Sequence, residues 1–126
     1  MTGDNRDPLT DKVIGLAIEV HRSLGPGLLE SAYEECLCYE FAQHGIPFER
    51  QVPLAIGYKD IRLDCGYRLD IVVEHRLILE MESVEQILRL HEAQLLTYLK
   101  LSGIRTGLLL NFNVTLMKEG IKRLVL

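Results

Sequence analysis

The stretch YRLDIVVEHRLILEME, residues 67–82, predicts a β-hairpin with its turn at residues 74–76. With this turn the opposing odd-numbered residues are Leu69 with Met81, Ile71 with Leu79, and Val73 with Leu77. Successive side chains of a strand point to opposite faces, so these apolar residues would share one core face. Moving the register by one residue would set them against Ile78, Glu80 and Glu82, so the pattern favours the first register.

The other face of the predicted hairpin carries charge. Asp70 lies opposite Glu80, and Arg68 lies opposite Glu82. Like charges that face each other directly destabilise a sheet unless something positive lies between them. Two neighbouring carboxylates are hard oxygen ligands that suit Mg²⁺ or Mn²⁺. The alternative is two solvated acids on an exposed face, neutralised by Arg68, and spacing alone leaves both interpretations open.

The hydrophobic spacing of the remaining chain predicts helices and strands in the order α-α-β-β-β-α-β-(β). The expected helices span residues 10–24, capped by Thr10, 28–44 and 84–101, and the further strands span 48–58, 61–63, 106–111 and 121–126. Pro53 interrupts the first strand, which indicates an edge or a bulge. The predicted fold class is α/β (α+β), with a mixed β-sheet flanked by helices.

Length and composition indicate one globular domain. The chain has 126 residues, which we divide into a polar lead-in (1–9) and a single domain (10–126). Its net charge of −4 argues against a protein that coats nucleic acid through a broad basic surface. It does not exclude an enzyme that contacts a few phosphates and uses a metal ion.

No apolar run reaches the roughly 20 residues that span a bilayer, and the first residues lack a secretory signal. We therefore expect a cytoplasmic location and no membrane partner. The apolar strand predicted at 121–126 offers an edge to a second copy, so a homodimer is one alternative.

Four short motifs occur along the chain. GLLESAY at 27–33 matches G-x-x-E-x-x-Y in full, and YRLD at 67–70, HEAQLLTY at 91–98 and LLNFN at 109–113 follow. In this order and spacing, the chain resembles the GxxExxY protein family, a branch of the PD-(D/E)XK nuclease superfamily, from about residue 9 to residue 126. The resemblance implies a restriction-endonuclease-like core and metal-dependent hydrolysis of nucleic acid. We expect the nucleic-acid partner to be DNA rather than RNA.

The resemblance also implies roles for particular acids. Asp70 and Glu80 fit the metal-binding positions for Mg²⁺ or Mn²⁺, and the backbone carbonyl of Met81 is a further candidate ligand. Glu30 matches an acid on an early helix that completes the metal shell in related nucleases. Its alternative role is a first-turn acid stabilised by the helix dipole.

Gln94 and Tyr98 match the Q-x-x-x-Y element of the RecB-type branch. Their spacing places both on one stripe of a helix, with His91 beside them. They would position the substrate or the site, and the alternative is the polar shoulder of a core helix.

Glu82 departs from the family pattern, which has lysine two residues after the acid. A lysine there would activate water and offset charge in the transition state. Glu82 would act instead as a general base or an extra ligand. The candidate catalytic residues are therefore Asp70, Glu80, Glu82, Gln94 and Tyr98. The alternative is a relative without catalysis that binds nucleic acid, metal or protein, with Arg68 and Glu82 forming a cross-strand ion pair.

Overall fold

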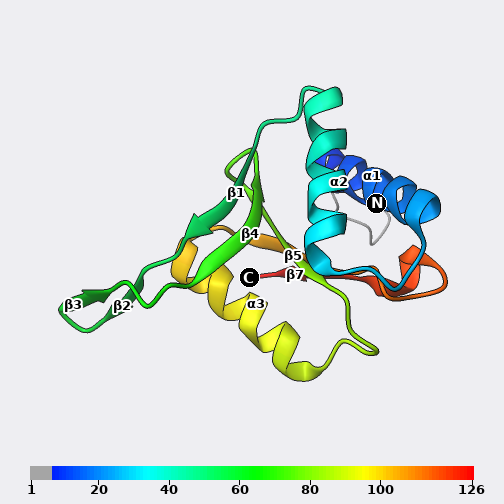
Figure 1. The fold of residues 1–126 in the computed structure, drawn as a ribbon. Helices are drawn as coiled ribbons and strands as arrows, with labels where there is room; N and C mark the ends of the chain where they lie inside the picture. The colour runs from blue at the N-terminus through cyan, green and yellow to red at the C-terminus, as the bar shows by residue number, and fades with distance from the viewer. Residues whose placement is uncertain (1–6) are drawn as a thin grey trace, which may run out of the picture.

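The computed structural model describes residues 7–126, which form three α-helices, a five-stranded sheet and a separate two-stranded sheet (Figure 1). The helices are α1 (Pro8–Leu24), α2 (Glu30–Gln43) and α3 (Arg89–Ser102), with a short 3₁₀ helix at Met117–Gly120. The strands are β1 (Phe48–Pro53), β2 (Ile56–Tyr58), β3 (Ile61–Leu63), β4 (Arg68–Val73), β5 (Leu77–Glu82), β6 (Thr106–Asn111) and β7 (Ile121–Val125). Over residues 7–126, no helix has the length and apolar character needed to cross a bilayer.

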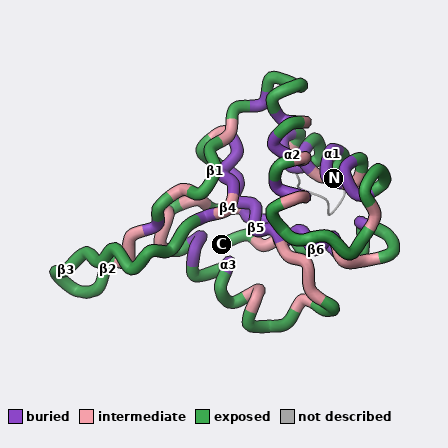
Figure 2. Tube along the Cα trace, viewed as in Figure 1, coloured by how far each residue is buried: buried purple, intermediate pink, exposed green. Residues whose placement is uncertain are grey.

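The main sheet has the order β1-β4-β5-β6-β7. Only β5 and β6 run parallel, and α3 provides the crossover between them. The sheet separates two apolar clusters. Figure 2 shows buried positions along the central strands and on the helices that cover them. One cluster packs α1 and α2 against one face, and the other packs α3 against the opposite face. The predicted mixed sheet flanked by helices is thus confirmed, and the fold is consistent with a restriction-endonuclease-like core.

The hairpin register is confirmed near the turn, where Ile71 pairs with Leu79 and Val73 with Leu77. The predicted pairing of Leu69 with Met81 is wrong. The paired positions of β4 and β5 end at Ile71 and Leu79, because β4 continues along β1 while β5 continues along β6. Leu69 pairs instead with Val52 and packs in the cluster beneath α3.

Helix α1 begins at Pro8, earlier than the predicted start at residue 10. Asp7 caps it, since its Oδ1 accepts the Thr10 N–H at 2.8 Å. Thr10 is buried inside the first turn and does not cap the helix. Residues 1–6 of the predicted lead-in lie outside the described part of the chain, so the division at residues 9 and 10 stays a prediction.

Helix α3 begins at Arg89, later than the predicted start at residue 84. The reason is the side chain of Asn111, which binds both backbone groups of Val84. Its Oδ1 accepts the Val84 N–H at 3.1 Å, and its Nδ2 donates to the Val84 carbonyl at 2.9 Å. These bonds hold the segment after β5 as a loop.

The predicted strand at 48–58 is divided into β1 and β2. Pro53 ends β1, an edge strand of the main sheet, as expected for a residue without a backbone N–H. Strands β2 and β3 pair only with each other and project from the body (Figure 1). We call residues 56–63 the projecting hairpin.

Tyr33 explains why the sequence G-x-x-E-x-x-Y is needed at the start of α2. The tyrosine is fully buried and stacks on Phe112, with ring centroids 4.4 Å apart. Its hydroxyl donates to the Gly25 carbonyl at 2.7 Å and accepts the Leu28 N–H at 3.0 Å. Gly27 has a φ of 99°, which side-chain-bearing residues rarely adopt. Tyrosine and glycine therefore shape the turn from which Glu30 emerges.

We expect Tyr33→Phe to lower the free energy of unfolding by about 1–2 kcal/mol, because the variant loses two hydrogen bonds and keeps the ring. Urea denaturation at pH 7 measures the change, with Tyr39→Phe as a matched control on an exposed tyrosine of the same helix. Equal stability of Tyr33→Phe and the wild type would show that the hydroxyl does not hold the turn.

Candidate active site

Asp70 and Glu80 meet where β4 and β5 diverge. The Asp70 N–H donates to Glu80 Oε2 at 3.1 Å, and the Met81 N–H donates to Asp70 Oδ2 at 2.8 Å. Each carboxylate thus satisfies a backbone N–H of the opposite strand beyond the last paired residues. Glu80 is only 7% exposed, whereas Asp70 is half-buried. The hairpin brings together the two acids that the sequence singled out.

The carboxyl groups are destabilised as anions. Burial, followed by the negative charge of Asp70, raises the pKa of Glu80 from 4.5 to about 8. Burial also raises the pKa of Asp70, although the Met81 N–H opposes this shift. A proton or a cation would therefore stabilise the pair.

Glu82 lies further along β5 and is half-buried. Burial raises its pKa, and the neighbouring His91 opposes this effect. The predicted ion pair between Glu82 and Arg68 is wrong. Arg68 is exposed, pairs with Pro53 on β1, and donates to the Tyr67 carbonyl at 3.2 Å, because β4 has already left β5 at this position.

Helix α2 brings two more acids to this region. Glu30 is exposed at its first residue, and its charge raises the pKa of Asp70 and Glu82. Glu34 lies one turn later, is 6% exposed, and raises the pKa of Asp70 and Glu80. Glu34 was not among the residues predicted from the sequence, although its spacing from Glu30 places both on one face of the helix.

Glu34 is held by two residues of β1. Arg50 donates to Glu34 Oε2 from Nε at 3.1 Å and from Nη2 at 2.9 Å, and it also binds Glu35 at 2.9 Å. Gln51 Nε2 donates to the Glu34 carboxylate at 3.2 Å, and the polar side chain of Gln51 also lowers the pKa of Asp70. The backbone of Gln51 has a φ of 52°. No sequence pattern signals this conformation, which interrupts the pairing of β1 with β4.

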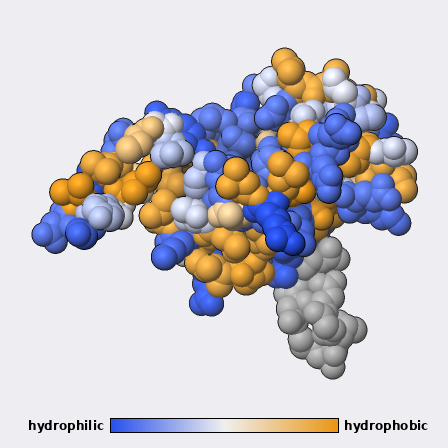
Figure 3. Space-filling model, turned by 90° about the horizontal axis from the view of Figure 1, so that it is seen from below, coloured by the Kyte–Doolittle hydropathy of each residue, from blue (hydrophilic) through white to orange (hydrophobic). Residues whose placement is uncertain are grey.

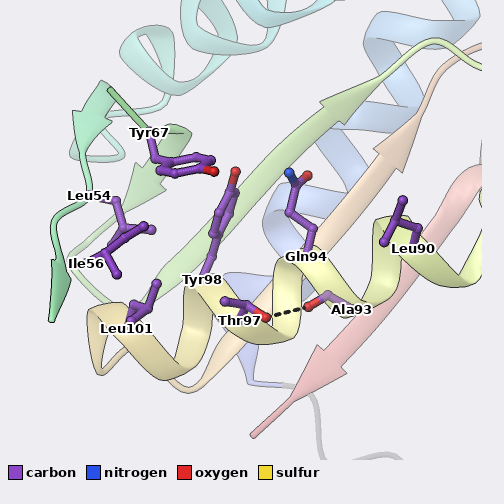
Figure 4. Close-up of a pocket in the computed structure, with 9 residues that line it drawn as sticks. All are labelled: Leu54, Ile56, Tyr67, Leu90, Ala93, Gln94, Thr97, Tyr98 and Leu101. Carbon is purple, nitrogen blue, oxygen red and sulfur yellow. Dashed lines mark hydrogen bonds between the residues drawn. The ribbon is translucent and has the colours of Figure 1, made fainter. Parts of the chain in front are cut away.

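Gln94 and Tyr98 lie side by side on α3 and line one pocket (Figure 4). Tyr98 is 8% exposed, and burial and the charge of Glu80 raise its pKa. Gln94 is exposed. His91 does not line this pocket. Its Nδ1 accepts the Leu88 N–H at 2.8 Å and caps the start of α3.

Comparison with known protein families identifies the superfamily to which the chain belongs. A family model for the PD-(D/E)XK nuclease superfamily matches residues 7–124. The chain belongs to this superfamily. No curated protein and no solved structure matches the chain. Membership in the PD-(D/E)XK superfamily supports a nuclease-like function with nucleic acid as the partner.

PD-(D/E)XK nucleases generally use divalent metal ions, and the donor chemistry of this site fits such an ion. Within residues 7–126, no lysine or arginine forms an ion pair with Asp70, Glu80 or Glu82. The same residues contain no group of three His, Cys, Asp or Glu side chains already arranged around one point. The carboxylates are thus suitable ligands by chemistry and charge, and their present positions do not form a finished metal shell.

The raised pKa of Glu80 predicts how stability depends on pH without metal. The folded protein retains a proton that the unfolded chain releases, so this stabilisation is complete below pH 4.5 and is lost as the pH rises through about 8. We expect the free energy of unfolding of the wild type to fall over this range. At pH 8 Glu80→Gln should be more stable than the wild type by about 2 kcal/mol or more, since its neutral amide needs no proton.

Urea denaturation in EDTA at several pH values measures this difference. Glu85→Gln, at an exposed glutamate, is the matched control and should follow the wild type. A Glu80→Gln curve parallel to that of the wild type would contradict the burial of an unpaired carboxyl.

Proposed function

We propose that this chain is a metal-dependent nuclease that hydrolyses phosphodiester bonds of nucleic acid. The observation that carries the proposal is the crossed pair of Asp70 and Glu80, whose carboxylates lie at the diverging end of a hairpin without a lysine or arginine partner among residues 7–126. Burying such a pair costs free energy unless a cation compensates it. Because the chain belongs to a superfamily of nucleases, we infer that the compensating cation is a metal ion that serves the reaction.

Asp70 and Glu80 would hold Mg²⁺ or Mn²⁺, with the Met81 carbonyl and Glu30 as further ligands. All are oxygen donors, which both ions prefer. When bound, such an ion activates water and stabilises negative charge that develops on a phosphate. The position of Glu30 at an exposed helix start leaves its carboxylate free to turn toward the pair.

The remaining candidate residues would act on the water and the substrate. Glu82 would accept a proton from the attacking water, and the burial that raises its pKa makes it a stronger base near neutral pH. Gln94 and Tyr98, on the adjoining face of α3, would position the substrate. Gln51, whose polar side chain lowers the pKa of Asp70, would favour the charged form of Asp70 that binds metal.

Specific observations favour a second candidate function, namely a binding module without cleavage. The family lysine is replaced by Glu82, and Arg68 does not supply the missing cation. The arginine that reaches this region, Arg50, is already engaged by Glu34 and Glu35. Without a cation for the transition state, the same acids would bind metal and nucleic acid and not cleave.

We also propose that the chain belongs to the GxxExxY branch of the superfamily and carries a RecB-type Q-x-x-x-Y element. The role of Tyr33 and Gly27 in the turn before α2 supports the GxxExxY branch, and the shared pocket of Gln94 and Tyr98 supports the RecB-type element. The preference for DNA over RNA, the homodimer and the cytoplasmic location stay predictions from the sequence.

Cleavage tests the proposed function directly. We expect the wild type to degrade labelled DNA in Mn²⁺ or Mg²⁺, and EDTA to abolish the reaction. Asp70→Asn should lower the rate at least about a hundredfold, because its amide is a weaker ligand than a carboxylate and carries no charge. Asp60→Asn, at an exposed aspartate of the projecting hairpin, should cleave like the wild type. Cleavage that survives Asp70→Asn or EDTA would contradict the proposal.

Glu82→Lys distinguishes the two candidate functions. If Glu82 is the base of an active nuclease, the substitution should lower the cleavage rate of the wild type. If the site has lost catalysis, the wild type should be inactive and Glu82→Lys should gain activity, because lysine supplies the missing cation. Gel assays of DNA and RNA in Mn²⁺ measure both outcomes.

A further inference from the structure

A pocket lies between α3 and the base of the projecting hairpin (Figure 4). Its volume is about 320 Å³, at the lower end of the range for small-molecule sites. Its lining residues are Leu54, Ile56, Tyr67, Leu90, Ala93, Gln94, Thr97, Tyr98 and Leu101. The pocket therefore has mostly apolar walls with aromatic and amide groups at one side.

Two tyrosine rings form that side of the pocket. The rings of Tyr67 and Tyr98 meet edge to face, with centroids 6.3 Å apart and an interplanar angle of 62°. Tyr98 is 8% exposed, whereas Tyr67 is 43% exposed and presents ring surface to a ligand. A flat, partly exposed aromatic ring above an apolar floor is the arrangement on which nucleobases stack.

Gln94 supplies a polar group at the rim. In Figure 4 its amide and the Tyr98 hydroxyl point to the same side of α3. The Gln94 amide makes no hydrogen bond to residues 7–126, whereas the Thr97 hydroxyl is engaged by the Ala93 carbonyl at 3.0 Å. An amide both donates and accepts, so it can pair with the edge of any base.

The pocket and the acids are neighbours. Tyr98 lines the pocket and also belongs to the apolar cluster that contains Leu69, the neighbour of Asp70 on β4. Burial and, after it, the charges of Glu80, Asp70 and Glu82 raise the pKa of Tyr98, so this tyrosine lies between the pocket and the acids. A phosphate that reaches the acids would therefore bring its own or an adjacent base to the mouth of the pocket.

We propose that this pocket is a nucleobase subsite, in which one unpaired base stacks on Tyr67 and hydrogen-bonds to Gln94. The inference rests on the proposed function, since it assigns a substrate class to the same site. A base within a duplex cannot enter, because its faces are covered by neighbouring pairs. The protein thus binds single strands or frayed ends in preference to intact duplex.

Apolar side chains also gather on this side of the molecule, over α3 and along the projecting hairpin (Figure 3). Leu88 and Leu90 are the most exposed leucines of this region, at 55% and 77%. Leu90 borders the pocket, but two tyrosine rings and an amide without a hydrogen-bond partner among residues 7–126 line the rest of it. These features favour a base over the side chain of a protein partner.

The test measures binding of a labelled single-stranded oligodeoxynucleotide by fluorescence anisotropy. It uses the wild type in Ca²⁺ and the Asp70→Asn/Glu80→Gln double variant in EDTA, in which positions 70 and 80 neither bind metal nor carry a negative charge. In both backgrounds Tyr67→Ala should weaken binding about tenfold or more, while Tyr67→Phe retains it. Tyr39→Ala, at a tyrosine on α2 that does not line this pocket, is the matched control.

Two further results are expected. An oligonucleotide of abasic residues should bind as weakly to the wild type as the intact strand binds to Tyr67→Ala, and a blunt duplex should bind more weakly than the single strand. Circular dichroism verifies that each variant is folded, and loss of folding in Tyr67→Ala leaves Gln94→Ala to carry the same comparison, with a smaller expected loss.

The outcomes separate the subsite from the nuclease activity. Equal binding of the wild type and Tyr67→Ala, equal binding of abasic and intact strands, or absence of single-strand binding would overturn the subsite, even if the wild type cleaves DNA. Tyr67-dependent binding in a wild type that does not cleave would retain the subsite and overturn the nuclease activity.

Discussion

The structure depends on the crossing of two hydrogen bonds between Asp70 and Glu80. Strand β4 pairs with β5 only from Ile71 onward, whereas its residues before Ile71 pair with β1 alone. The backbone groups of Asp70 and Met81 therefore lack the partners that a regular β4–β5 ladder would provide. The two carboxylates replace them, since each accepts a backbone N–H from the opposite strand. The point where β4 and β5 diverge therefore requires acids to complete its hydrogen bonding. These acids lie at the end of the hairpin without an arginine or lysine partner in the described chain. The carboxylate oxygens that complete the hydrogen bonding of the two strands are thus also the oxygens of the candidate metal site.

The sequence predicted what local pattern determines. Alternation of apolar residues placed β5, and a short apolar run placed β6, at their observed bounds, while Gly45 marked the end of α2 and Pro53 the interruption after β1. The structure differs from these predictions where residues far apart in the sequence determine the backbone conformation. Asn111 prevents an early start of α3, and the divergence of β4 from β5 removes the partner expected for Arg68. No window of sequence contains both halves of these interactions.

In the candidate site, too, the residues within one hairpin were predicted and those brought in by packing were not. Asp70 and Glu80 were found because their register follows from one hairpin, and the structure brings them together as the spacing required. Glu34 and Gln51 were missed because they reach the acids only after α2 and β1 have packed against β4. Gln51 adopts a left-handed backbone, an unfavourable state for a residue with a side chain, and such strain often occurs near functional groups. The bond between these two residues ties α2, which carries Glu30, to β1, the strand that pairs with the Asp70 strand β4.

Calorimetric titration of the metal-free protein with Mn²⁺ at pH 7 tests the central claim most directly, namely that the crossed acids form a cation site. Because burial raises the pKa of Glu80 to about 8, the carboxyl is mostly protonated at this pH and must release its proton when a cation binds. Titrations in two buffers with different ionisation enthalpies should therefore give different heats, corresponding to close to one proton released per ion, and the Asp70→Asn/Glu80→Gln variant should give no binding heat. Absence of binding by the wild type, or undiminished binding by the double variant, would contradict the account.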